Sequence, residues 1–262
     1  LPQRLTEKGS FVIVRLNDER GTPPAYRRRQ VFFVVRNLTE GTPWRQIMVL
    51  VLPLLLGNDA DCAAVGEFFC GAGRGCQDLA VVTLGTGIGC GLVLGGRLRG
   101  GVASSEGGHI TICQDGELCN CGRRGCWEQY ASATALIRET KAAMAAHPKS
   151  LLHELAAQNG VEGKTVFQAA EAGDETALMV CQTYVRFLAD GVISLVNMLR
   201  PEVVAIGGGV AGAPDALLLE PLRELVNRES YARHGGRSTQ VLRAELGNDA
   251  GILGAALLQR AI

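Results

Sequence analysis

The stretch from Glu106 to Glu128, EGGHITICQDGELCNCGRRGCWE, constrains the chain most, because it gathers four good metal ligands. Three thiolates and one imidazole form a donor set that closes a tetrahedral structural zinc site, and the glycines between them allow sharp turns. A closed site of this kind is architectural rather than catalytic. The four predicted ligands are His109, Cys119, Cys121 and Cys126.

The alternative interpretation of this stretch is a group of buried free thiols, since cysteine is among the most buried residue types. We favour zinc, because Cys-Asn-Cys and Cys-Gly-Arg-Arg-Gly-Cys stand beside a histidine with no aliphatic run between them. Cys113, in the same stretch, is interpreted as a small hydrophobic residue. With nine cysteines, an odd number, and no secretory signal expected, we predict a reducing cytoplasm rather than a disulfide scaffold.

Composition and charge narrow the class of partner. With 262 residues, 47% of them hydrophobic, the chain is long enough to bury a large core. Its formal net charge is zero, which argues against nucleic acid or an anionic membrane and for a small-molecule partner. The longest apolar run, IMVLVLPLLL, contains a proline and is about half as long as a membrane span requires.

The first fifty residues are basic and contain two apolar bursts, FVIVRL (11–16) and VFFVV (31–35), which we predict to be strands. Their function cannot be read from the residues. An Arg-rich transit peptide is disfavoured, because such peptides are rich in serine and poor in acids. We expect residues 1–57 to form one unit and residues 58–262 the functional core.

A predicted buried strand ends at Asn58 and Asp59, and a helical pattern follows. Junctions from strand to helix are where α/β folds place chemistry. An Asn-Asp pair at such a junction can also be no more than a helix cap. The residues alone leave these alternatives open.

Two glycine-rich turns are candidate nucleotide sites. A predicted hairpin over residues 78–101 turns through Gly85, Thr86, Gly87 and Gly89, where bare backbone N–H groups can meet phosphate oxygens. The same glycines are also compatible with a simple tight hairpin. A predicted strand from Val203 to Ile206 ends in glycines on which a flat adenine ring can lie, unless they are only a flexible turn: Gly207, Gly208 and Gly209.

The remaining segments predict helices. Apolar spacing of three and four predicts surface helices over residues 130–146 and 165–199, with breaks at 147–150 and 158–164. The last segment, from residue 245, is a glycine-containing turn into an amphipathic helix. We assign no second catalytic pair to its Asn-Asp.

The pattern E-x-G-H, followed by C-x-C-G-x-x-G-C-x-E, resembles the signature of the ROK family of sugar kinases and sugar-responsive repressors, and most closely its glucokinases. Four further segments agree in order: GNDADCAAVGE, TLGTGIG, VVAIGGGV and LGNDAGILGAA. The resemblance covers roughly residues 53–262. It implies an α/β fold of the actin-like ATPase (ribonuclease H-like) type, with two lobes, a cleft and an incomplete N-terminal lobe.

The resemblance also implies roles for individual residues. Asp59 stands where the family keeps the general base that deprotonates the 6-hydroxyl of a hexose. Asn58 would hold a neighbouring hydroxyl, and three residues would bind the sugar: Glu106, His109 and Glu128. The implied reaction is ATP-dependent phosphorylation of a hexose, with glucose as the first candidate.

The implied cofactors are ATP with Mg²⁺, bound between the two glycine turns, and structural Zn²⁺. The implied assembly is a homodimer or homotetramer. The sequence departs from the family at its start, because neither D-x-G-G-T nor G-x-P-G occurs in residues 1–52. One alternative is therefore a catalytically impaired sugar-binding protein. A sugar-responsive repressor is another, although it needs an N-terminal helix-turn-helix, and residues 1–50 show strands and prolines instead.

Overall fold

The computed structural model describes residues 57–99, 104–235 and 238–261, together with the backbone of three strands nearer the N-terminus. The chain divides into two units, Leu1–Leu56 and Gly57–Ile262. In the first unit the strands form an antiparallel sheet in the order β1-β2-β3. The strands predicted at 11–16 and 31–35, and the strand before Asn58, are confirmed as β1 Phe11–Arg15, β2 Arg29–Val35 and β3 Met48–Leu54.

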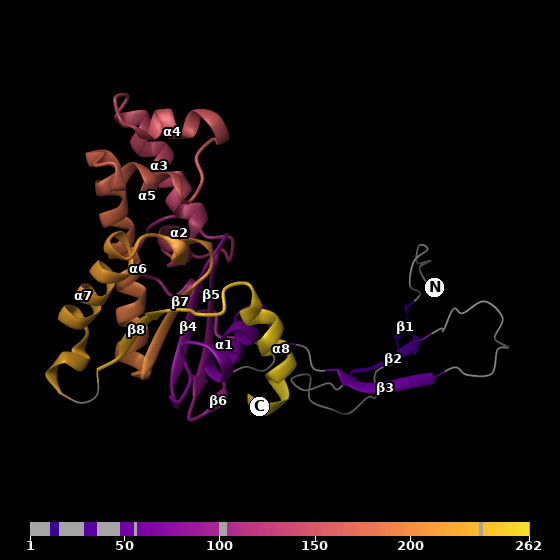
Figure 1. Ribbon diagram of the computed structural model, residues 1–262. Helices are drawn as coiled ribbons and strands as arrows, with labels where there is room; N and C mark the ends of the chain where they lie inside the picture. The colour runs from indigo at the N-terminus through magenta and orange to yellow at the C-terminus, as the bar shows by residue number, and fades with distance from the viewer. Residues whose placement is uncertain are drawn as a thin grey trace. The chain divides into compact units, whose positions relative to one another are not determined.

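The second unit is built on a five-stranded sheet in the order β6-β5-β4-β7-β8 (Figure 1). Its first three strands, β4 Leu79–Leu84, β5 Ile88–Leu94 and β6 Arg97–Leu98, form an antiparallel meander, as the predicted hairpin requires. Two strands parallel to β4 follow, β7 Val203–Gly207 and β8 Gln240–Arg243. Parallel neighbours need long crossover connections, and here helices supply them.

Helices cover both faces of this sheet (Figure 1). On one face lie α6 Glu175–Leu199 and α7 Leu219–Glu229, and on the other lie α1 Asp59–Cys70 and α8 Asp249–Ala261. Four further helices lie between β6 and α6 in the chain: α2 Glu128–Ala131, α3 Ala133–Ala146, α4 Leu152–Asn159 and α5 Thr165–Glu171. Single 3₁₀ turns occur at η2 Gly107–His109, η3 Gly209–Gly212, η4 Asp215–Leu217 and η5 Tyr231–His234.

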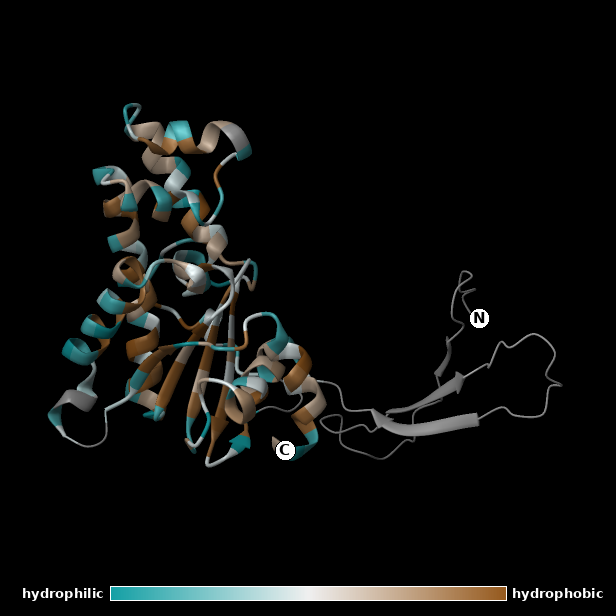
Figure 2. Ribbon diagram, in the orientation of Figure 1, coloured by the Kyte–Doolittle hydropathy of each residue, from teal (hydrophilic) through white to brown (hydrophobic). Residues whose placement is uncertain are grey.

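The central strands are apolar on both faces (Figure 2). Along β4, Val82 and Leu84 belong to the core beneath α6 and α7, while Leu79 and Val81 belong to the smaller core beneath α1. A strand buried on both faces needs a continuous apolar run rather than an alternating one. This explains why LAVVTL and VVAIG carry no charged residue.

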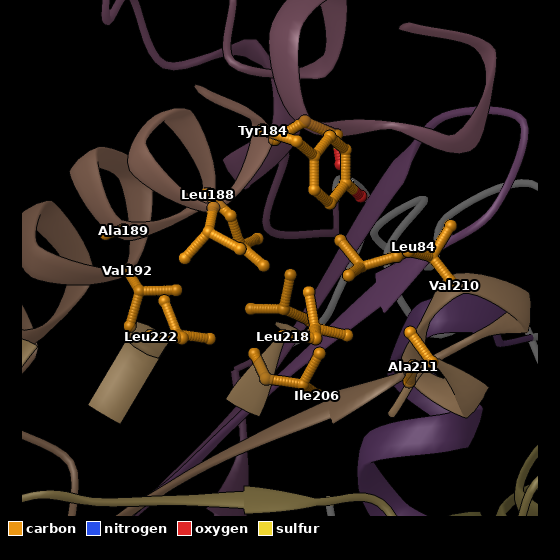
Figure 3. Packing of buried hydrophobic residues seen from close by; sticks show 14 of the residues in the cluster. Leu84, Tyr184, Leu188, Ala189, Val192, Ile206, Val210, Ala211, Leu218 and Leu222 are labelled. Carbon is orange, nitrogen blue, oxygen red and sulfur yellow. The ribbon is translucent and has the colours of Figure 1, made fainter. Parts of the chain in front are cut away.

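Helix α6 corrects the expectation of a surface helix over 165–199. Two helices are present, because Gly173 has a positive φ of 87° and Asp174 caps the start of α6. The apolar face of α6 is buried: Leu188 and Val192 point toward the core residues of β7 and α7 (Figure 3). By length and composition α6 could cross a membrane, yet 56% of its apolar window is buried inside the protein, as in a core helix.

Two other helix predictions differ from the structure. The helix expected from residue 130 is interrupted at Ser132, whose hydroxyl accepts a hydrogen bond of 3.1 Å from the N–H of Ala135 and so begins α3. Helix α4 lies mostly between the two predicted breaks, at 147–150 and 158–164, where no helix was predicted. Both differences arise because capping residues and a short helix leave little periodic signal.

Close contact between α1 and α8 depends on two glycines. A Cβ atom at Gly66 would collide with the carbonyl oxygen of Ala250, and one at Gly254 with that of Cys62. The two helix backbones therefore approach more closely than larger side chains would permit. This packing fixes α1, whose first turn carries Asn58 and Asp59.

Candidate active site and metal-ligand cluster

The N-terminus of α1 presents Asn58 and Asp59. The Asn58 Oδ1 atom accepts hydrogen bonds from the N–H groups of Ala60 at 2.8 Å and Asp61 at 3.4 Å, so Asn58 is the helix cap. The Asp59 Oδ1 atom accepts a second bond from Ala60 at 2.9 Å, and its side chain is exposed. Capping and chemistry are compatible here, because both side chains also line a cavity.

This cavity has a volume of about 420 Å³, within the range of about 300–1,000 Å³ found for small-molecule sites. It brings together most of the predicted site residues, namely Asn58, Asp59, Gly85, Thr86, Gly87, Gly89, Glu106, Glu128 and Gly208. Its wall does not include His109, Gly207 or Gly209. The lining residues that sequence reasoning missed are Ala60, Thr83, Ile88, Cys90, Ser104 and Ser105.

A second cavity of about 290 Å³ adjoins the first and shares Thr83 and Gly208 with it. All three glycines at the end of β7 line this second cavity, together with polar side chains that the sequence did not single out: Glu67, Arg243 and Glu245. Gly208 has a positive φ of 84°, and a Cβ atom there would collide with the backbone of Leu84. The glycines after β7 therefore pack against the end of β4, where the first glycine turn begins.

The larger cavity is acidic. Its lining residues, all within the described part of the chain, include the carboxyl groups of Asp59, Glu106 and Glu128 and contain no Lys, Arg or His. Behind them, burial raises the pKa of Asp61 above its usual value, although a hydrogen bond from Ser104 opposes this effect. Burial also raises the pKa of the Cys90 thiol to about 12, so this wall residue is a neutral thiol.

Glu106 immediately precedes η2, which carries His109. The backbone N–H of His109 donates to the carbonyl oxygen of Glu106 at 3.0 Å, so the two residues belong to one tight turn. The His109 Nδ1 atom lies 3.5 Å from the Cys119 sulfur, which points the ring toward the cysteine cluster. Glu106 thus faces the cavity while His109 faces the cluster.

The four predicted metal ligands lie together. One ligand atom from each of His109, Cys119, Cys121 and Cys126 falls within 4.8 Å of all the others. The Cys121 and Cys126 sulfurs are 3.6 Å apart. Tetrahedral Zn–S bonds of about 2.3 Å separate two sulfurs by about 3.8 Å, so the spacing fits zinc. Because Cys121 is exposed, a cluster of buried free thiols explains the arrangement less well.

The sheet order and the helices on both of its faces define an actin-like ATPase fold, here combined with an acidic cavity, glycine turns and a Cys₃His cluster. A profile of the ROK family matches residues 49–262. The chain belongs to the ROK family.

Glucokinases are prominent among its relatives. The glucokinase of Streptomyces coelicolor is 38% identical over 80% of this chain and 68% of its own length. The crystal structure of a ROK family glucokinase from Streptomyces griseus in complex with glucose and AMPPNP is 41% identical, with a TM-score of 0.71 over 79% of this chain and 68% of that one. The chain spans 62% to 68% of the length of the curated glucokinases it matches.

Repressors of the family are more distant. The xylose repressor of Bacillus subtilis is 29% identical over 78% of this chain and 49% of the repressor. The part of the repressor that this chain matches is thus about half of it.

Proposed function

We propose that this chain is the core of an ATP-dependent hexose kinase that transfers the γ-phosphoryl group to the 6-hydroxyl of glucose. The observation that carries the proposal is the single cavity in which Asp59, Glu106 and Glu128 face a glycine turn. Carboxylates accept hydrogen bonds from sugar hydroxyls, and backbone N–H groups in a glycine turn donate to phosphate oxygens. The proposed binding sites for ATP and for the hexose are therefore adjacent.

Asp59 is proposed as the general base. Its carboxylate takes the proton from the 6-hydroxyl while that oxygen forms a bond to the γ-phosphorus, and the bond between the γ-phosphorus and the oxygen bridging to the β-phosphate breaks to release ADP. The start of a helix is a favourable place for negative charge. Asp59, in this position, can contact the 6-hydroxyl beside the proposed phosphate-binding turn.

The hexose would be oriented by polar groups around Asp59. Asn58 and Glu106 hold hydroxyls beside the reacting one, and Glu128 holds a hydroxyl at the glycine turn. His109 lies outside the cavity wall. We therefore propose that it acts mainly by fixing the Glu106 turn, with its Nε2 atom left to donate to a sugar oxygen when Nδ1 binds metal.

ATP is proposed to place its triphosphate along Gly85, Thr86, Gly87 and Gly89, and its adenine beside Gly207, Gly208 and Gly209. Both turns border the cavities described above. Since the described lining of the larger cavity holds acids and no basic residue, a cation must balance the triphosphate. Mg²⁺ bound to the phosphates supplies that charge.

Zn²⁺ is proposed as a structural ion held by His109 and the three clustered cysteines. It would fix the segment 106–128, whose two ends carry the sugar-binding acids. The expected cytoplasmic location and the assembly as a homodimer or homotetramer stay proposals that rest on the family resemblance.

The test is a coupled ADP assay with glucose and MgATP, with Asp59→Asn as the matched variant. We expect turnover in the native chain and a loss of about 10²- to 10⁴-fold in Asp59→Asn, the usual range for a general base. Equal rates in both proteins would show contaminating activity. Glucose binding with no turnover in either protein would establish instead the catalytically impaired sugar-binding protein.

A further inference from the structure

Glu128 connects the metal-ligand segment to the glycine turn. Its Oε2 atom accepts a hydrogen bond of 3.0 Å from the N–H of Ile88, and a Cβ atom at Gly87 would collide with the same oxygen. Among the described residues, Ile88 is the one donor to this carboxylate, and Glu128 lines the larger cavity. One oxygen of Glu128 therefore holds the turn, while the other is available to a ligand.

The start of α3 holds the same turn from a second side. The N–H of Ala133 donates to the carbonyl oxygen of Gly85 at 2.8 Å, and the Thr134 hydroxyl donates to the carbonyl oxygen of Thr86 at 2.8 Å. In the described part of the chain, the N–H groups of Thr86 and Gly87 have no hydrogen-bond partner. The carbonyl groups of the turn are thus fixed, and two of its N–H groups are left for an anion.

We propose that Glu128 couples the binding of hexose to the binding of nucleotide, and that Thr134 is a positioning residue for the phosphate-binding turn. This inference rests on the proposed function. A hexose hydroxyl that donates a hydrogen bond to the free oxygen of Glu128 restricts the motion of the carboxylate. The carboxylate in turn restricts the motion of Ile88 and of the glycine turn. Each substrate then meets a site that the other has already ordered, so each binds more tightly in the presence of the other.

The first experiment is calorimetric titration of the full chain with Mg²⁺-AMPPNP, with and without saturating glucose, and the reverse titration. Linkage requires the same factor in both directions, and we expect roughly fivefold or more. In Glu128→Gln this factor should fall toward one. The Gln side chain offers one acceptor oxygen and one NH₂ donor, so when its oxygen accepts from Ile88, the group that faces the hexose can no longer accept from a hydroxyl.

The second experiment separates positioning from general stability by means of Thr134→Val. We expect a roughly two- to tenfold loss of nucleotide affinity, the scale of one neutral hydrogen bond, with glucose affinity measured alone unchanged. Thr134→Ser keeps the hydroxyl and should restore nucleotide binding. The matched control is Thr183→Val, because Thr183 is also exposed and its hydroxyl donates to the Met179 carbonyl oxygen at 2.9 Å on α6.

The outcomes distinguish this inference from the proposed function. If the native chain binds both ligands but each is indifferent to the other, the coupling is overturned and the kinase proposal stands. Coupling that persists in Glu128→Gln, or equal nucleotide affinities in Thr134→Val and Thr183→Val, also overturns it. If the native chain binds neither ligand, the proposed function fails and this inference fails with it.

Discussion

The Ser104 hydroxyl donates a hydrogen bond of 2.8 Å to the Asp61 Oδ2 atom, and so ties the turn that carries Glu106 to the helix that carries Asp59. Asp61 is only 3% exposed, and its Oδ1 atom is a buried oxygen with no hydrogen-bond partner among the described residues. An ionised carboxylate in such a place is costly, since burial disfavours the charged form. The contact therefore links two walls of the cavity at some expense in stability.

Replacing Asp61 by Asn should make stability less dependent on pH. Burial raises the pKa of Asp61 above 3.8, so its favourable contribution is fully present below that pH and is lost as the pH rises through the folded-state pKa. The free energy of unfolding of Asp61→Asn, relative to the native chain, should therefore increase as the pH rises from about 4 to 7. Urea titrations at several pH values measure it. A difference that stays constant as the pH rises would contradict this account.

Two glycines of α8 should respond in opposite directions to alanine. Gly254→Ala places a Cβ atom against the Cys62 carbonyl oxygen and should destabilise the protein by about 1–3 kcal/mol. Gly251 has open space around its Cβ position, so Gly251→Ala should stabilise the same helix by about 0.5–1 kcal/mol. Thermal unfolding of the pair measures both effects. Similar shifts in the two variants would mean that α1 and α8 do not pack this closely.

Asp174 should be a strong local stabiliser. Its carboxylate accepts hydrogen bonds from the N–H groups of Ala177 at 2.8 Å and Leu151 at 2.7 Å and from the Ser150 hydroxyl, so it caps α6 and fixes the approach to α4. Asp174→Ala should cost about 1–2 kcal/mol, as for other helix caps. Chemical denaturation at neutral pH checks this value.

The effect of Asp174 should also depend on pH. Burial opposes its ionisation, but the hydrogen bonds outweigh burial and lower the pKa below 3.8. The stabilisation is therefore present above the unfolded-state pKa and is lost as the pH falls through the folded-state pKa. The difference between the native chain and Asp174→Ala should shrink in acid. A difference that grew as the pH fell would contradict the assignment.

Removal of a metal ligand should affect both the metal and the sugar. The native chain should hold about one zinc ion, and Cys121→Ser should lose it together with glucose affinity, because the ion fixes the segment between Glu106 and Glu128. Elemental analysis and glucose titration measure the two quantities. Cys113 lies outside the four-ligand group, so Cys113→Ser should retain both. Unchanged glucose binding in a zinc-free preparation would show that zinc does not fix the sugar-binding segment.

Much of the fold was predictable because its signals are local. The apolar runs of β4 and β7 and the turn through Gly85 and Gly87 follow from neighbouring residues alone. The break at Gly173 also had a local signal, a glycine followed by a capping aspartate, which the continuing apolar period concealed.

The candidate site was predictable only in part. Asn58, Asp59 and Glu106 were found through motifs, yet the contact between Ser104 and Asp61 and that between Thr134 and the glycine turn join distant segments. An acid in the first turn of a helix is commonly read as a favourable partner of the helix dipole, and this concealed the burial of Asp61. Pairings of this kind depend on tertiary packing, which no single stretch of sequence displays.

A crystal structure of the chain with glucose would show whether Asp59 meets the reacting hydroxyl. We expect the sugar in the larger cavity, with its 6-hydroxyl about 2.6–3.2 Å from a carboxylate oxygen of Asp59 and other hydroxyls on Glu106 and Glu128. Glucose bound elsewhere, or bound in this cavity with its 6-hydroxyl turned away from Asp59, would contradict it.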